Sequence, residues 1–294
     1  MRELAADPDR LQLGGKKREL TIMFADIRGF TGLAERLEDA PDKLTRIINI
    51  FLTHMTRVLQ ARRGTVDKYI GDNIMGFWNA PAEVAHHAYE ACHAALEMHA
   101  ALPAVNAELR DDPLLAGRGG ELAIGIGLNT GTTLVGNIGS SQRFNYSVLG
   151  DTVNIAARLE GQTRLYGVAT IVGEDTREAA RAAAVERGEG DFAFLELDLI
   201  ALKGREQPLR VFALLGDGDM AAGAEFQTHE RLHTDMLAAY RGRDWETAAR
   251  LARTAGDNLP ALRDFYAMLG ERIAHYKAHP PPEGWYGQFV ATRK

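Results

Sequence analysis

The sequence of 294 residues is poor in cysteine, in long apolar runs and in excess positive charge. Its single cysteine, Cys92, cannot form an internal disulfide, which argues against a small secreted scaffold. No apolar run approaches the roughly 20 residues that span a bilayer, and the first residues lack the apolar core of a secretion signal. The formal net charge of -6 disfavours a surface for nucleic acids or anionic membranes. We therefore expect a cytoplasmic protein whose own residues contact neither.

Two common nucleotide-binding signatures are also absent. No GxxxxGK[ST] loop occurs, and GIGLNTG at 125–131 lacks the spacing and the following helix of a dinucleotide fingerprint. The composition itself is that of an ordinary globular protein, with 46% hydrophobic and 25% charged residues. The length allows one large domain and an appendage.

Apolar periodicity predicts alternating strands and helices between residues 18 and 216. The order βαββαβ, followed by extra strands, predicts a ferredoxin-like α+β fold in which helices cover one face of an antiparallel sheet. The expected elements are a strand at 21–25, a helix at 41–64, a hairpin turning at 71–72, a helix at 81–102, two strands joined by a turn at 129–131, a strand at 144–149 followed by a helix, a strand at 168–173, a helix at 174–181 and a closing hairpin up to 216.

The two ends of the chain differ in composition from this middle part. Residues 1–17 are polar and end in a glycine pair followed by lysines, which is typical of a linker. After a small-residue stretch from 217, three helices are expected, one near 229–240, a second that begins near 244–245 and a third at 260–276, and the last residues are predicted to be extended. The spacing of Tyr, Trp and small residues is similar to that of one tetratricopeptide helical pair. Residues 217–294 are therefore interpreted as a helical extension that serves as a docking or stabilising appendage of the main domain.

The strand at 21–25 ends at a charged residue, Asp26, and the chain then enters a helix through Gly29. A lone aspartate at such a point is more often a cap than a functional group. In a sheet of the expected order, the first strand lies beside the central hairpin, so Asp26 and Asp72 are predicted to meet at one sheet edge. Two converging carboxylates repel each other unless a cation lies between them, and divalent cations prefer oxygen ligands. The alternative, two turn-forming aspartates, stays open on the residues alone.

Further polar residues accompany this pair. Lys68 lies four residues before Asp72, and the segment YSVLGDTVNIAAR supplies Ser147, Asn154 and Arg158, of which the last two share a helical face. Each has an ordinary structural interpretation as a surface pair, a neutral strand residue or a solvated side chain. The backbone N-H groups of the helix start after Asp26, at residues 29–31, could bind phosphates.

Three motifs together, FADIRGFT, VDKYIGD and YSVLGDTVNIAARLEG, make residues 18–216 resemble the catalytic domain of class III nucleotidyl cyclases. The chain further resembles the bacterial type found after CHASE2 sensor domains, which implies a membrane sensor preceding it in the full protein. The resemblance implies that Asp26 and Asp72, with the Ile27 carbonyl, bind two Mg²⁺ or Mn²⁺ ions. It implies that Lys68 and Ser147 contact the purine, Asn154 the ribose and Arg158 the α-phosphate. The phosphate contacts would come from residues Gly29, Phe30, Thr31, Arg143 and Lys203.

The purine is selected by hydrogen bonding. Lys68 can only donate, which suits the N1 acceptor of adenine and not the N1-H of guanine, so ATP is the expected substrate. Ser147 could accept from the adenine amino group or donate to the guanine carbonyl. The resemblance also implies that each site is shared between two subunits, so a homodimer with two equivalent sites is expected. The alternatives are a guanylate cyclase and a cyclase-like dimerisation or nucleotide-sensing module without turnover.

Overall fold

The computed structural model of the chain describes residues 14–140, 142–201 and 208–290. These residues form one nine-stranded sheet in the order β2-β3-β1-β4-β6-β8-β7-β9, with β5 paired to β4. Neighbouring strands are antiparallel except β4 with β6 and β7 with β9. The strands are β1 Gly14–Ile27, β2 Thr65–Ile70, β3 Asn73–Trp78, β4 Ile124–Gly139, β5 Phe144–Leu149, β6 Thr170–Gly173, β7 Ala193–Ala201, β8 Leu209–Gly216 and β9 Gln288–Val290.

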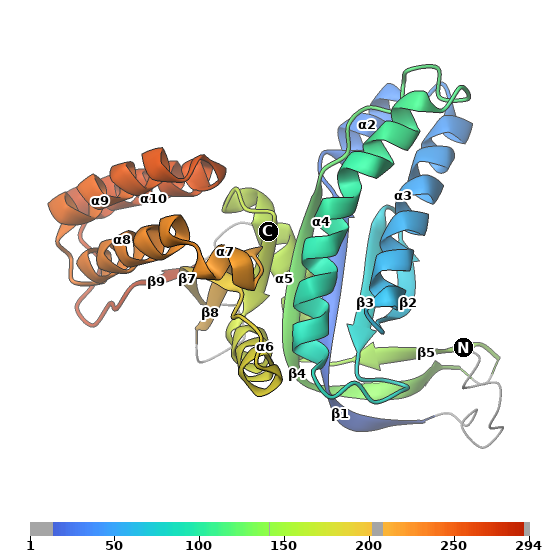
Figure 1. Cartoon of the computed structure of the whole chain (residues 1–294), viewed down its shortest axis with the longest axis horizontal. Helices are drawn as coiled ribbons and strands as arrows, with labels where there is room; N and C mark the ends of the chain where they lie inside the picture. The colour runs from blue at the N-terminus through green and yellow to red at the C-terminus, as the bar shows by residue number, and fades with distance from the viewer. Residues whose placement is uncertain (1–13, 141, 202–207, 291–294) are drawn as a thin grey trace.

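The helices group at two places along this sheet (Figure 1). Long helices stand against the strands near the N-terminal half of the chain, and three helices of the C-terminal segment lie side by side at the other end. They are α2 Phe30–Arg36, α3 Pro41–Ala61, α4 His87–Asp111, α5 Asp151–Leu165, α6 Glu174–Arg187, α7 Gly218–Ala222, α8 Ala224–Arg241, α9 Trp245–Asn258, the short 3-10 helix Pro260–Leu262 and α10 Arg263–Ala278. The mixed α+β class expected from the sequence is confirmed. In the described residues no helix is long and apolar enough to cross a membrane.

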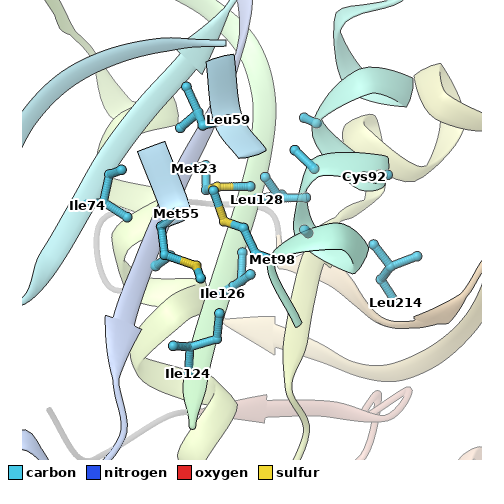
Figure 2. Close-up of a cluster of buried hydrophobic side chains, with 14 of the residues drawn as sticks. Met23, Met55, Leu59, Ile74, Cys92, Met98, Ile124, Ile126, Leu128 and Leu214 are labelled. Atoms are coloured by element: carbon cyan, nitrogen blue, oxygen red, sulfur yellow. The ribbon is translucent and has the colours of Figure 1, made fainter. Parts of the chain in front are cut away.

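One face of the sheet carries the larger apolar core. Figure 2 shows Met23, Ile126 and Leu128 from the sheet meeting side chains of α3 and α4. Cys92, on α4, is fully buried among them, so this lone cysteine serves as an apolar core residue. The helix α4 begins later and ends later than the predicted 81–102, because Val105 and Leu109 still pack into this core.

The opposite face is covered by α5, so the expectation that helices cover only one face is wrong. Two glycines of β4, Gly125 and Gly127, face this helix. A Cβ on Gly127 would lie 2.2 Å from the backbone nitrogen of Glu160, so only glycine allows α5 to approach so closely. Leu20, Ile22 and Ala156 belong to a smaller core on this side.

The predicted turn at 129–131 is also wrong, because β4 runs without a break from Ile124 to Gly139. The polar residues that suggested a turn are buried in the sheet and bonded to distant groups. The Thr130 hydroxyl is 2.8 Å from that of Thr21 and receives a hydrogen bond of 3.0 Å from Thr176. The Asn129 amide donates to the Thr152 carbonyl at 3.4 Å. Tertiary partners therefore replace the local bonds that a turn would have supplied.

Strand β1 pairs with β4 along its whole length, from Gly14 opposite Asn137 to Ile27 opposite Ile124. It therefore begins inside the segment 1–17 that the sequence predicts as a linker, of which residues 1–13 lie outside the described part. Gly136 allows this close pairing, since a Cβ there would lie 2.1 Å from the Gly14 carbonyl oxygen.

The three helices expected after residue 216 are present as α8, α9 and α10, and they share a core with the sheet. The small-residue stretch from 217 is itself partly helical, since it contains α7 and the start of α8 at Ala224. Their apolar side chains pack with α5, β7 and β8 in a second cluster that includes Phe226, Leu237, Phe265, Leu195 and Ile200. Strand β9 then pairs in parallel with β7 and extends the same sheet. The helical extension is therefore joined to the sheet by both packing and backbone hydrogen bonds.

Candidate active site

Asp26 lies near the end of β1, between β3 on one side and β4 on the other. Its neighbours Ala25 and Ile27 point into the larger core, so strand alternation directs Asp26 to the opposite face, where α5 lies. Its partner across the strand is Gly125, and the missing Cβ of this glycine leaves room for the side chains of Thr163 and Glu160 from α5. Asp26 is half-buried, so the residue remains partly accessible to solvent.

Asp72 follows Gly71 in the β2-β3 turn, where Gly71 takes a positive φ of 65°. Because β3 pairs with β1, this turn lies next to the end of β1, and Asp72 comes within hydrogen-bonding reach of Asp26. The Oδ2 atom of Asp72 is buried and receives no hydrogen bond in the described residues. Burial, followed by the contact and the charge of Asp72, raises the pKa of Asp26 to about 7. The sequence prediction that the two carboxylates converge is confirmed in its geometry.

A third carboxylate, Glu160 of α5, faces this pair and was missed from the sequence. Burial raises its pKa to about 7, against the opposing effect of the nearby Arg164 and Arg28. Arg28 is itself held by backbone carbonyls, since its Nε donates to Ile124 at 3.2 Å and its Nη2 donates to Val168. These residues border a cavity of about 520 Å³ that opens beside Asp26. The sequence does hold a signal for Glu160. At 100° per residue, it lies on the opposite side of α5 from Arg158, so the two side chains are predicted to face different groups.

Asn154 and Arg158 are exposed on the outer side of α5. They share a face, as predicted, and neither side chain forms a hydrogen bond or ion pair within the described residues. The same helix turns Ala156 toward the sheet, so this face points away from the carboxylates of its own chain. A single chain therefore does not bring Arg158 to Asp26 and Asp72.

Lys68 and Ser147 form a separate group. Figure 1 shows β5 below the β2-β3 hairpin. The Lys68 Nζ of β2 donates to the Ser147 Oγ of β5 at 3.3 Å. Ser147 is buried, and its hydroxyl donates to the Asp67 carboxylate at 2.8 Å. Asp67 was not among the residues predicted from the sequence. Lys68 and Ser147, which are expected to contact the same ligand, thus meet within one chain. Neither is hydrogen-bonded to Asp26 or Asp72 in the described residues.

The remaining predicted residues lie around these groups. Gly29 takes a φ of 69° directly before α2, whose first residues are Phe30 and Thr31. Phe30 is partly buried against the larger core, whereas Thr31 is exposed. Arg143 is exposed in the turn between β4 and β5. Lys203 lies outside the described residues.

The Asp26-Asp72 pair fits a divalent cation. A buried carboxylate oxygen without a donor, beside a second carboxylate that binds its proton unusually tightly, is satisfied by a hard cation with oxygen ligands. Within the described ranges no three His, Cys, Asp or Glu side chains are grouped to hold a metal. Further ligands would have to be a backbone carbonyl, such as that of Ile27, or atoms of a bound substrate.

Comparison with known proteins identifies the family. The family model described as the adenylate and guanylate cyclase catalytic domain matches residues 15–216. The chain therefore belongs to this family, as the three sequence motifs predicted.

Among characterised relatives, adenylate cyclase 1 of Rhizobium meliloti (strain 1021) is 32% identical over 200 residues, which are 68% of this chain and 28% of that protein. An adenylate cyclase of Anabaena cylindrica is 36% identical over 159 residues, 53% of this chain and 30% of that protein. The chain thus spans less than a third of the length of these relatives. A sensor of the CHASE2 type, which the sequence predicts upstream, stays a prediction.

Solved structures share the fold. The guanylyl cyclase Cya2 is 32% identical, with a TM-score of 0.58 over 70% of this chain and 96% of that one. The adenylyl cyclase CyaB from P. aeruginosa is 27% identical, with a TM-score of 0.59 over 70% of this chain and 97% of that one. Relatives of both nucleotide specificities are therefore similar to this chain.

Proposed function

We propose that this chain is the catalytic domain of an adenylate cyclase, which converts ATP into 3′,5′-cyclic AMP and pyrophosphate. The observation that carries the proposal is the convergence of Asp26 and Asp72, two carboxylates without a compensating cation, in a domain of the cyclase family. Asp26, Asp72 and the Ile27 carbonyl would hold two Mg²⁺ or Mn²⁺ ions. When bound, such ions promote ionisation of the attacking 3′-hydroxyl and neutralise charge on the phosphates.

The other residues would position the nucleotide. Asn154 would orient the ribose, and Arg158 would stabilise the negative charge that develops on the α-phosphate. The backbone N-H groups at Gly29, Phe30 and Thr31, together with the side chains of Arg143 and Lys203, would contact the terminal phosphates. The reaction is intramolecular, so orientation of the hydroxyl against the α-phosphate supplies a large part of the rate enhancement.

We propose further that two chains share each site. Asn154 and Arg158 face away from the carboxylates of their own chain, so a second copy would bring them to the metal pair. The surface around Lys68 and Ser147 supports this, because it exposes large apolar side chains that a second copy would cover. These side chains are between 37% and 54% exposed: Tyr69, Ile70, Leu134, Phe144 and Leu149.

The choice of ATP rests on Lys68. The Lys68 side chain is 46% exposed, and its ammonium group beside Ser147 can only donate hydrogen bonds, which complements N1 of adenine and opposes N1-H of guanine. The printed names of the relatives include both activities, so the assay must offer both nucleotides. Purified protein is incubated with ATP or GTP and Mg²⁺ or Mn²⁺, and the product is identified. Cyclic AMP supports the proposal, cyclic GMP supports a guanylate cyclase, and no product from either nucleotide supports a module without turnover.

A complementation experiment tests the shared site. Asp26→Ala and Arg158→Ala chains are each expected to be inactive, and their mixture is expected to regain activity. In a mixed dimer one site combines both damaged halves and the other is intact, so a random mixture should reach about a quarter of wild-type activity. A mixture that stays as inactive as the separate variants, although mixed dimers form, would contradict the shared site.

A further inference from the structure

Asp67 of β2 has no role in the mechanism proposed above. Strand β2 carries a bulge between Val66 and Lys68 opposite β3, and Asp67 is the extra residue. On a regular strand, neighbouring side chains point to opposite faces. The bulge changes this alternation, and the side chains of both Asp67 and Lys68 reach Ser147. The Asp67 side chain is fully buried, at 0% exposure.

The hydrogen bonds around Ser147 fix the direction of its hydroxyl. A serine hydroxyl has one hydrogen to donate and two lone pairs with which to accept. The hydrogen of Ser147 goes to Asp67 Oδ2 at 2.8 Å, and one lone pair accepts from Lys68 Nζ at 3.3 Å. No other described residue donates to this oxygen, so its second lone pair can accept from a ligand. Lys68 Nζ also lies 3.3 Å from Asp67 Oδ1, so the same carboxylate compensates the charge of the lysine.

Reversing this direction would leave the buried Oδ2 atom of Asp67 without a hydrogen bond in the described residues. If Ser147 donated its hydrogen to a ligand, Asp67 Oδ2 would lose the one hydrogen bond it receives in the described residues, and its Oδ1 already receives none. Hydrogen bonds to a buried carboxylate are stronger than those between neutral groups, and losing one is costly. A ligand that needs a donor at this point should bind about ten- to a hundredfold more weakly than one that offers a donor.

We propose that Asp67 is the positioning residue that makes this site select adenine, an inference that rests on the proposed function. Asp67 keeps Ser147 an acceptor, while Lys68 remains a donor. Adenine presents the complementary edge, an N1 acceptor next to an amino donor, whereas guanine presents an N1-H donor next to a carbonyl acceptor. Asp67 thereby removes the ambiguity of Ser147, whose hydroxyl alone could serve either base. It acts through Ser147 and does not itself reach the nucleotide.

The test compares nucleotide selection in the wild type and in Asp67→Asn, which keeps the shape of the side chain. The amide can either donate to or accept from Ser147, so the hydroxyl can turn to suit either base. The ratio of kcat/KM for ATP to that for GTP is expected to fall about tenfold or more, mainly through KM. Binding of 2′,3′-dideoxy-ATP and 2′,3′-dideoxy-GTP, which lack the attacking hydroxyl, is measured in parallel and should show the same change.

Ser147→Ala supplies the matched background. If Asp67 acts through the hydroxyl, Asp67→Asn should change selectivity in the wild type but not in the Ser147→Ala protein, which a double-mutant cycle measures. An equal change in both backgrounds would show a merely structural role and overturn the inference. An unchanged ATP preference in Asp67→Asn would overturn it too, while leaving the proposed function intact. A wild type that binds neither dideoxynucleotide would overturn the proposed function and this inference together.

Discussion

Two acidic sites on different strands of the sheet, Asp198 on β7 and Asp26 on β1 with its partner Asp72, differ in how their charge is compensated. Asp198 of β7 is 3% exposed, accepts a hydrogen bond from Arg272 of α10 at 2.6 Å, and accepts another from the Tyr166 hydroxyl at 2.7 Å. Its charge is fully compensated. Asp26 and Asp72 face each other without any arginine or lysine bonded to them in the described residues, and Glu160 adds a third acidic group nearby.

The difference separates a structural cluster from the pair that we propose to be functional. The Asp198 cluster joins the end of α5, strand β7 and the helical extension through bonds that are complete within the chain. The Asp26-Asp72 pair has no positively charged partner bonded to it in the described residues, and the pKa of Asp26 is raised as a result of burial and of Asp72. Holding both carboxylates ionised is unfavourable unless a ligand supplies positive charge. This missing compensation is the reason why we propose the Asp26-Asp72 pair, and not the Asp198 cluster, as a cation site.

The largest expected effect is on activity at the incomplete pair. Asp72→Ala or Asp26→Ala should lower cyclase activity by about a thousandfold or more, because several kcal/mol of transition-state stabilisation depend on the metal ions. The folded chain should be no less stable, since the substitution removes a repulsion. Asp235→Ala, at an exposed position on α8, is the control for both activity and melting temperature. An Asp72→Ala protein that keeps a tenth of wild-type activity would contradict the assigned role.

A second prediction addresses the complete cluster. Asp198→Ala should destabilise the chain by about 3–5 kcal/mol, because it leaves the Arg272 guanidinium buried without its partner. Replacing both residues, as Asp198→Leu with Arg272→Leu, should recover most of this loss, since an apolar pair needs no compensation. Chemical denaturation measures both. Equal losses in the single and double variants would show that the ion pair itself is not what the site requires.

The smallest expected effect is on pH dependence. The pKa of Asp26 lies at about 7 in the folded chain against an ordinary 3.8, so between these values the folded state holds a proton that the unfolded state has released. The stability of the metal-free protein should therefore fall as the pH rises through this window, and Asp26→Asn should make the fall shallower. Melting temperatures in a chelator from pH 5 to pH 8 test this.

Mn²⁺ or Mg²⁺ should raise the melting temperature of the wild type at pH 8 and not that of Asp26→Asn, and an equal rise in both would argue against metal binding at the pair.

The convergence of Asp26 and Asp72 could be predicted because it depends on local signals. A strand ending on a charge and a Gly-Asp hairpin turn are both visible in the sequence, and the order of elements places them at one edge. The helices after residue 216 were predicted for the same reason, since their apolar spacing is regular. The motifs further identified the family, which the family model confirms over residues 15–216.

The failures involve residues whose partners are far away in the sequence. Asn129 and Thr130 have the composition of a turn, yet they lie in a strand because Thr21, Thr152 and Thr176 satisfy them. Glu160 was missed because, although the helical angle places it opposite Arg158, its distance from Asp26 depends on how closely the glycines of β4 allow α5 to approach. Asp67 was missed because the bulge that turns it toward Ser147 has no local sequence signal. Such pairings follow from the assembled sheet and not from any one segment.

The burial of Cys92 has a practical consequence for studying this chain. Thiol reagents react with the exposed, ionised form, and burial both encloses this sulfur and raises its pKa. Because Cys92 is the single cysteine of this sequence and is buried, thiol labels are expected to react very little with the unsubstituted chain. A cysteine introduced for Arg143, at the exposed turn between β4 and β5, would carry a spin label or fluorophore without competition. Distances between two such labels would follow the approach of two subunits directly, with the natural cysteine left in place.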